Sequence, residues 1–418
     1  MLSKTDAEAV RRQNRRLSIE HFRRAGASTR RRLSEATGLS FSAASSIASD
    51  LLREGVLSED EAAAVPARRG RPEFSLSLSP ARALLAAVKV TVGEVAVHIC
   101  DYAGGIVAAR SREADLLALD GPALVDAVEG LIDATLDEGR IARLDRIVVA
   151  VQGVTDSASR RLLWSPILKA RDTDMATSLE ARFAAPVTVA NDCGLMPERF
   201  RWSGEIDEPA FATLFIGFGV GMGLKLSGST FRGARSSAVE FGHLNHIPGG
   251  EPCRCGNHGC IEAYAGDYAI WRAARGANAR HLGHRVDEMD MAELAQAARA
   301  GERLALAAYE RAGEALGYGL GRMFTLIDPV PVAFVGSGAA AMDLLEPAIR
   351  RGIAVSAIEG IGRDTPFFVF PDSDEVLLDA SLAFGLAAID DELAGAIAPA
   401  GRNMGAEDAP APLMGGMT

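Results

Sequence analysis

Apolar residues in the first 60 positions have the spacing of two short helices. They recur at intervals of three and four within residues 33–39 and again within 44–52, with Gly38 between the two runs. Glycine accepts the positive φ that a tight turn between helices needs, and Ser40 or Ser42 can cap the second helix. The pattern therefore predicts a helix-turn-helix.

A strand-like alternation follows these helices. Phe74, Leu76 and Leu78 are apolar, and the residues between them are polar. A hairpin directly after the second helix would form a wing. We therefore expect residues 1–80 to be a winged helix-turn-helix DNA-binding domain with a basic wing or linker, ending near Pro80.

The rest of the chain alternates strands and helices as an α/β protein does. Three strand-like runs over 84–110, a helix at 121–139, a strand, a helix and a further strand follow one another up to residue 191. A strand pair around a glycine cluster begins a second series. We expect a two-lobed actin-like (ribonuclease H-like) sugar kinase fold, with a first lobe of residues 81–190 plus 375–394, a second lobe of 191–374 and a disordered tail of 395–418.

Composition and charge limit the class of protein. The chain has 418 residues, 48% of them hydrophobic, which is enough for two or three cores. It has no apolar run of about 18 residues and no apolar signal core, so we expect a cytoplasmic protein without a membrane partner. The net charge of −11 divides into +4 for the first 80 residues and −15 for the remainder. This suggests a polyanionic partner for the N-terminal part, although charge alone fits an ordinary solvated surface better.

Three of the five cysteines form a compact group with the spacing of metal ligands. Cys253, Cys255 and Cys260 lie within eight residues, interleaved with glycines, and His243 precedes them. Three thiolates and one imidazole complete a tetrahedral Zn²⁺ shell that leaves no position for water, so we predict a structural zinc site at these four residues. His246 and His258 compete with His243 as the fourth ligand, and buried free cysteines are the alternative to a metal.

This segment resembles the signature of the ROK family (repressor, open reading frame, kinase). Residues 239–246 and 251–264 contain its Glu-x-Gly-His and Cys-x-Cys-Gly-x-x-Gly-Cys-x-Glu patterns, with every fixed position present. The N-terminal helix-turn-helix followed by Gly-Arg-Pro resembles the repressor branch of the family. The resemblance covers about residues 10–390, and further landmarks occur in order at Asn191–Asp192, 217–223 and 331–340.

The resemblance implies a sugar site. By it, the hydroxyl groups of a sugar would be held by Asn191, Asp192, Glu240, His243 and Glu262. Carboxylates and amides are the groups that bind neighbouring hydroxyls in pairs, and His243 could place one ring nitrogen on zinc and the other on the sugar. Each acidic residue taken alone could equally be a surface carboxylate.

The sequence departs from the kinases of this family at the first hairpin. The kinases carry Asp-x-Gly-Gly-Thr there, whereas this chain has Lys89 for the aspartate and Thr91 and Val92 for the glycines. Close approach of the backbone to phosphate is lost, and so is the metal-facing carboxylate, so we expect no enzyme activity. Asp192, the catalytic base of the family, would then be a ligand contact.

The second helix of the helix-turn-helix should enter the major groove by its N-terminal end. The side chains there are too short for bidentate base contacts, and they are Ser40, Ser42, Ala43, Ser45 and Ser46. We expect phosphate contacts from Arg30, Arg31 and Arg32 and, upstream, from Arg11, Arg12, Arg15 and Arg16. Arg69 and Arg71 resemble an arm that enters a narrow minor groove, and a flexible basic linker explains them equally well.

Together these features predict a DNA-binding transcriptional regulator, a repressor by its resemblance. We expect it to bind a double-stranded DNA operator, and so the nucleoid, as a homodimer or tetramer. A small sugar or sugar phosphate would be its effector. Two alternatives stay open, namely a sugar kinase with an added N-terminal domain and a regulator controlled by a partner protein.

Overall fold

The computed structural model describes residues 4–65, 73–237, 239–276, 286–358, 360 and 362–395, with only the backbone of residues 4–7, 60–65 and 73. The chain forms two compact units: unit 1 comprises Met1–Leu78 and Ala387–Thr418, and unit 2 comprises Ser79–Leu386. None of the helices in the described ranges has the length and hydropathy of a membrane span. Arg69, Arg71 and the expected tail from residue 396 onward lie outside these ranges.

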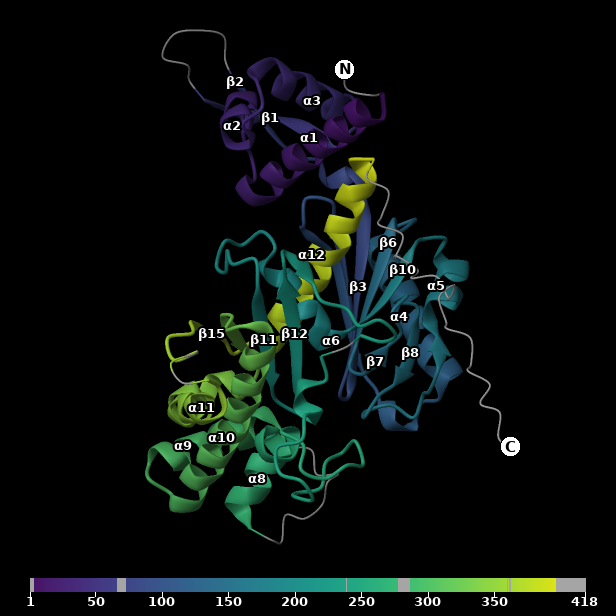
Figure 1. The fold of residues 1–418 in the computed structure, drawn as a ribbon. Helices are drawn as coiled ribbons and strands as arrows, with labels where there is room; N and C mark the ends of the chain where they lie inside the picture. The colour runs from purple at the N-terminus through teal and green to yellow at the C-terminus, as the bar shows by residue number, and fades with distance from the viewer. Residues whose placement is uncertain are drawn as a thin grey trace, which may run out of the picture. The chain divides into compact units, whose positions relative to one another are not determined.

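Unit 1 contains the predicted pair of helices and the hairpin (Figure 1). Gly38 ends α2 with a φ of 71°, and the side chain of Ser40 caps α3 by accepting a hydrogen bond from the Ala43 amide. Leu33, Leu51 and Leu76 are fully buried and pack the helices on the hairpin. The elements are α1 (Lys4–Ala25), α2 (Arg30–Thr37), α3 (Phe41–Arg53), β1 (Leu57–Val65) and β2 (Glu73–Leu78), the strands being antiparallel.

The end of helix α12 (Ser373–Leu393) also belongs to unit 1. The guanidinium of Arg23 forms two hydrogen bonds of 3.0 Å with the carboxylate of Asp390, and Arg16 lies 3.1 Å from Asp391. We expected all of residues 375–394 in the first lobe. The last turns of α12 group with unit 1 instead, because their carboxylates pair with the arginines of α1.

The first sheet of unit 2 confirms the predicted order of strands and helices. Its strand order is β10-β6-β3-β4-β5, parallel across the first three strands and antiparallel across the last three. Apolar residues of this sheet and of the helices on it form one buried core. The elements are β3 (Leu84–Thr91), β4 (Glu94–Asp101), β5 (Ile106–Glu113), α4 (Gly121–Gly139), β6 (Arg146–Val151), α5 (Met175–Phe183) and β10 (Val187–Asn191).

The second sheet of unit 2 has the order β13-β12-β11-β14-β15. Its strands are β11 (Phe211–Ile216), β12 (Val220–Leu226), β13 (Ser229–Thr230), β14 (Val332–Val335) and β15 (Phe367–Phe370). Its helices are α7 (Glu262–Ala265), α8 (Asp267–Arg275), α9 (Glu288–Arg299), α10 (Arg303–Ile327) and α11 (Met342–Ser356). Helices α10 and α11 lie very close together because glycine stands at their contact: a Cβ atom at Gly317 would overlap the carbonyl of Ile349.

A third, smaller sheet was not predicted. It consists of β7 (Val154–Thr155), β8 (Arg161–Trp164) and β9 (Thr173–Asp174) in that order. Strands of two to four residues are too short to show the alternation of apolar and polar positions by which strands are predicted.

The buried ion pair of unit 1 leads to a stability prediction. The side chains of Arg23 and Asp390 are 3% and 9% exposed, and removing Asp390 takes two hydrogen bonds from a carboxylate away from the buried guanidinium of Arg23. Asp390→Ala should therefore lower the free energy of unfolding of unit 1 by about 3–5 kcal/mol in urea titration. Glu20→Ala is the control, because its exposed pair with Arg24 should contribute at most about 1 kcal/mol. Equal midpoints for Asp390→Ala and wild type would contradict the prediction.

Candidate functional site

The hairpin between β3 and β4 holds Lys89 in a tight pair of ionic contacts. Thr91 pairs with Glu94 in the strand register, so Val92 and Gly93 form the turn, Gly93 with a φ of 78°. The ammonium of Lys89 lies 2.8 Å from both Glu94 and Asp374. Burial opposes its ionisation, but the hydrogen bonds to these two carboxylates outweigh burial and raise the pKa of Lys89. The lysine is thus fully engaged within the protein.

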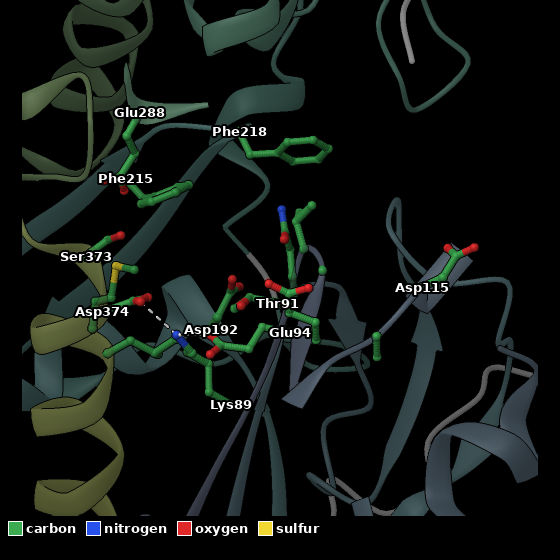
Figure 2. Close-up of a pocket in the computed structure, with 17 residues that line it drawn as sticks. Lys89, Thr91, Glu94, Asp115, Asp192, Phe215, Phe218, Glu288, Ser373 and Asp374 are labelled. Atoms are coloured by element: carbon green, nitrogen blue, oxygen red, sulfur yellow. Dashed lines mark hydrogen bonds and ion pairs between the residues drawn. The ribbon is translucent and has the colours of Figure 1, made fainter. Parts of the chain in front are cut away.

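Beside this hairpin lies a cavity of about 650 Å³, here called the large cavity (Figure 2). Lys89 points toward Asp374, at the start of α12, and is the one cation among the described residues that line it. Six lining residues are carboxylates, namely Glu94, Glu113, Asp115, Asp192, Glu288 and Asp374. The surroundings are therefore strongly negative.

A second, small cavity of about 70 Å³ shares Gln152, Asp192 and Phe215 with the large cavity. All five residues predicted to hold a sugar line it, and they are Asn191, Asp192, Glu240, His243 and Glu262. They come from the end of β10, the start of α6 (Asp192–Leu195), the 3-10 turn Phe241–His243 and the start of α7. Segments far apart in the sequence thus bring these side chains to one cavity.

Asn191 supports Asp192 through local hydrogen bonds. Its amide oxygen accepts from the Gly194 amide at 2.7 Å, and its NH₂ group donates to the Gly153 carbonyl at 2.8 Å and to Asp192 Oδ1 at 3.1 Å. Asp192 Oδ1 also accepts from the Cys193 amide at 2.8 Å. Both amide protons of Asn191 are used, so this residue positions Asp192 more than it offers donors to a ligand. Burial raises the pKa of Asp192 to about 6.

The glycine loop at residues 217–223 fits closely against the carboxylate of Glu262. Glu262 Oε2 accepts a hydrogen bond of 3.3 Å from the Val220 amide. A Cβ atom at Gly219 would lie 2.8 Å from the same oxygen, and one at Gly221 would overlap the sulfur of Cys193. Gly221 is therefore required by the packing of the cavity wall, whether or not a phosphate binds there, and Gly219 leaves room for the carboxylate of Glu262.

The four predicted metal ligands meet at one point. One ligand atom from each of His243, Cys253, Cys255 and Cys260 lies within 4.8 Å of the others. The sulfurs of Cys255 and Cys260 are 3.7 Å apart, and Cys253 Sγ is 3.7 Å from His243 Nδ1. A tetrahedral ion with Zn–S bonds of about 2.3 Å separates its ligand atoms by roughly 3.5–3.8 Å. The donor set and its spacing fit such an ion.

The two competing histidines do not join this group among the described residues. The ring of His246 packs against the rings of Tyr264 and Tyr318 instead. Burial raises the pKa of Cys253, and it raises the pKa of Cys260 to about 11. A divalent cation would supply the positive charge that allows these thiols to ionise.

The residues predicted to contact DNA lie at the start of α3 and on α2. Ser40, Ser42 and Ser46 are exposed, whereas Ala43 and Ser45 are half-buried. Arg31 pairs with Glu35 at 3.0 Å, and Arg30 lies 3.8 Å from Glu59. Arg32 is exposed.

Three of the upstream arginines that were expected to contact phosphates lie beside carboxylates of unit 1. Arg15 is buried and paired with Glu54, and Arg11 lies 3.0 Å from Asp50. Arg16 pairs with Asp391 as described above. Acidic neighbours within unit 1 therefore engage these guanidinium groups.

Three residues near these sites were missed by sequence reasoning. Gln152 and Trp164 line the small cavity, and Phe41 stands 59% exposed at the first position of α3. Gln152 directly follows the buried strand β6. A polar residue at the end of a buried strand is a sequence feature by which Gln152 could have been predicted as a site residue. Trp164 comes from the short strand β8, which has no apolar–polar alternation long enough to be predicted from the sequence.

Comparisons with known proteins agree on one family. The sequence model of the ROK family matches residues 87–369. The chain is 27% identical over 190 residues to the xylose repressor of Caldicellulosiruptor bescii, across 44% of this chain and 48% of that protein. It is 27% identical over 264 residues to a glucokinase of Streptomyces coelicolor, across 60% of this chain and 82% of that protein. The chain thus spans about half the length of the repressor relative.

A solved structure shares the fold over most of the chain. It is a ROK family transcriptional regulator described as a homolog of the Escherichia coli MLC protein, with a TM-score of 0.73 and 19% identity, covering 91% of this chain and 98% of that one. The mixed α/β fold of unit 2 is therefore the actin-like fold of that family's structures.

The buried carboxyl of Asp192 predicts a pH-dependent stability difference. In the unfolded chain this group ionises near its ordinary pKa of 3.8, but in the folded protein only near 6. Folding is therefore penalised as the pH rises from about 4 to 6, and the penalty is complete above 6. Asp192→Asn should gain stability over wild type at pH 8, by at most roughly 3 kcal/mol, and much less at pH 4. Urea titrations at both pH values measure this, and a difference independent of pH would contradict it.

Proposed function

We propose that this chain, which belongs to the ROK family, is a DNA-binding transcriptional regulator whose affinity for its operator is shifted by a sugar. One observation carries the proposal: a single chain joins the helix pair α2–α3 and the hairpin β1–β2 to a domain of this family. Two helices joined by a glycine turn and followed by a hairpin have the form of a winged helix-turn-helix.

The N-terminal unit would bind the operator through α3. The exposed serines of its first turns would lie in the major groove, and Arg32 would contact phosphate. Because these side chains are short, a single N-terminal unit would bind DNA weakly. A symmetric homodimer or tetramer would supply two such units for two half-sites of the operator. The repressor role follows the relative named xylose repressor.

The small cavity would hold the sugar. Asp192, Glu240 and Glu262 offer acceptors for hydroxyl groups, and Asn191 fixes the position of Asp192. Among the described residues, no lysine or arginine lines this cavity, and Lys89 of the large cavity is already paired twice. A phosphate attached to the sugar would meet carboxylates in either cavity. The charges therefore favour a neutral sugar over a sugar phosphate.

The same charges oppose the kinase alternative, to which the glucokinase relative points. A kinase needs the negative phosphates of ATP beside a glycine-rich turn and a metal-binding carboxylate. Here Thr91 and Val92 carry side chains at that turn, and Lys89 replaces the carboxylate. We infer that this chain does not transfer phosphate and that Asp192 serves as a ligand contact.

The cluster of His243 and three cysteines would hold a structural Zn²⁺ ion. All four ligand positions would come from the protein, so the ion would supply folding energy and no catalytic water. His243 would be oriented by the metal through one ring nitrogen, which leaves the other available to the small cavity.

Metal analysis tests the zinc site. Wild-type protein purified without chelator should contain close to one equivalent of zinc, and Cys255→Ser should lose it and unfold at lower urea concentration, since the binding energy of the ion stabilises the fold. Cys100→Ser is the matched control, because Cys100 lies on β4 outside the cluster and its loss should leave the zinc content unchanged. Zinc retained in Cys255→Ser, or absent from wild type, would refute the assignment.

Operator titration tests the regulatory function. A duplex selected from a random DNA library would be titrated with and without glucose, xylose or N-acetylglucosamine and their phosphate esters. One neutral sugar should change the operator affinity, and its phosphate ester should act at least about tenfold more weakly. Glu262→Gln should bind DNA normally but lose sugar affinity on the order of tenfold, because one hydrogen bond to a charged acceptor is replaced by a mispaired donor.

Glu251→Gln is the control for this titration. Glu251 lies in the same loop but outside the small cavity and pairs with Arg272 at 3.2 Å, so this variant should respond to sugar like wild type. A Glu262→Gln protein that keeps the full sugar response would remove the cavity as the sensor and favour control by a partner protein. Turnover of ATP with any of these sugars would favour the kinase alternative.

A further inference from the structure

Helix α3 begins with a large apolar side chain that the protein leaves in solvent. Phe41 is the first residue of the helix, and 59% of its surface is exposed. Three other apolar residues of the helix behave differently: Ala44, Ala48 and Leu51 are fully buried and form its inner face. Phe41 therefore lies away from the core, at the end of the helix that would lead into the major groove.

The hydroxyl group of Ser40, the residue before Phe41, is engaged within the helix. The Oγ atom of Ser40 accepts the hydrogen bond of the Ala43 amide at 3.3 Å and lies 3.1 Å from the Oγ atom of Ser42. Ser40 is needed there as the helix cap. The hydroxyl of Ser40 is thus committed to the cap, and Phe41 is the one long side chain of the first turn of α3.

We propose that Phe41 reads thymine by apolar contact with its 5-methyl group in the major groove. A phenyl ring has no donor or acceptor for base edges, so of the groups that the major groove presents, only the thymine methyl suits it. Cytosine lacks this methyl group, and a ring placed against the exocyclic amine of cytosine or adenine would desolvate that amine without a partner. This inference rests on the proposed DNA-binding function and adds a residue that determines its sequence preference.

Replacing thymine by deoxyuridine tests this contact directly, because the exchange removes only the methyl group. Full-length wild type and Phe41→Ala would each select duplexes from a random library, and the affinity of each protein for the wild-type duplex would then be measured with thymine or deoxyuridine at each selected position. At one position in each half-site, deoxyuridine should weaken wild-type binding on the order of fourfold, which corresponds to the burial of one methyl group. Phe41→Ala should bind both duplexes equally and should lose its preference for thymine there.

Two controls separate this contact from a general loss of binding. Phe41 is exposed, so the Phe41→Ala protein should unfold at the same urea concentration as wild type. Arg32→Ala removes an exposed cation of α2. This variant should bind both duplexes more weakly by the same factor, and the difference in affinity between the thymine and deoxyuridine duplexes should remain.

The outcomes distinguish the inference from the function on which it rests. If wild type selects a sequence but no position distinguishes thymine from deoxyuridine, or if Phe41→Ala keeps the difference, the role of Phe41 is refuted and DNA binding stands. If wild type selects no sequence, the regulatory function itself is refuted, and the proposed contact of Phe41 with thymine is refuted as well.

Discussion

The convergence of His243, Cys253, Cys255 and Cys260 is the constraint on which the small cavity depends. Glu240 and His243 come before the cysteines and Glu262 comes two residues after the last of them, so folding this loop back on itself places all three around one space. The loop has no room for side chains where it folds back: a Cβ atom at Gly259 would overlap the carbonyl of Ile247, and one at Gly242 would overlap that of Val220. The four candidate metal ligands and three of the residues proposed to bind the sugar thus come from one segment of the chain.

The wall of the large cavity at the β3–β4 hairpin depends on Lys89. Its position on β3 would bring an isolated ammonium into a partly buried cavity, at a high cost in desolvation. Glu94 on the neighbouring strand and Asp374 in the first turn of α12 neutralise it. Asp374 is also placed favourably for the dipole of that helix. These two contacts therefore hold α12 against the first sheet. With Lys89 neutralised, the large cavity keeps an excess of carboxylates, which would repel phosphates.

Local patterns in the sequence predicted much of this structure, while contacts between distant segments could not be predicted. Helix α4 begins and ends within one residue of the expected 121–139, since its periodicity is long and regular, and the family was predicted from a motif of adjacent residues. Arg16 was expected to contact phosphate, and nothing in the spacing of the arginines in α1 indicates that Asp391, more than 360 residues away, pairs with it. The choice among His243, His246 and His258 likewise required the folded loop.

The hydrogen bonds around Asp192 limit which donors and acceptors the small cavity can offer to the proposed sugar. Each sugar hydroxyl is both a donor and an acceptor, whereas ionised carboxylates only accept. Burial holds the pKa of Asp192 near 6, so this group passes between its accepting and donating forms about one pH unit below neutrality. Asn191 uses both of its amide protons within the protein, so it cannot supply the missing donors. Donors must then come from the other lining side chains that carry N–H groups, namely Gln152, Trp164 and His243. The carboxylates beside them would disfavour any ligand that brings a negative charge.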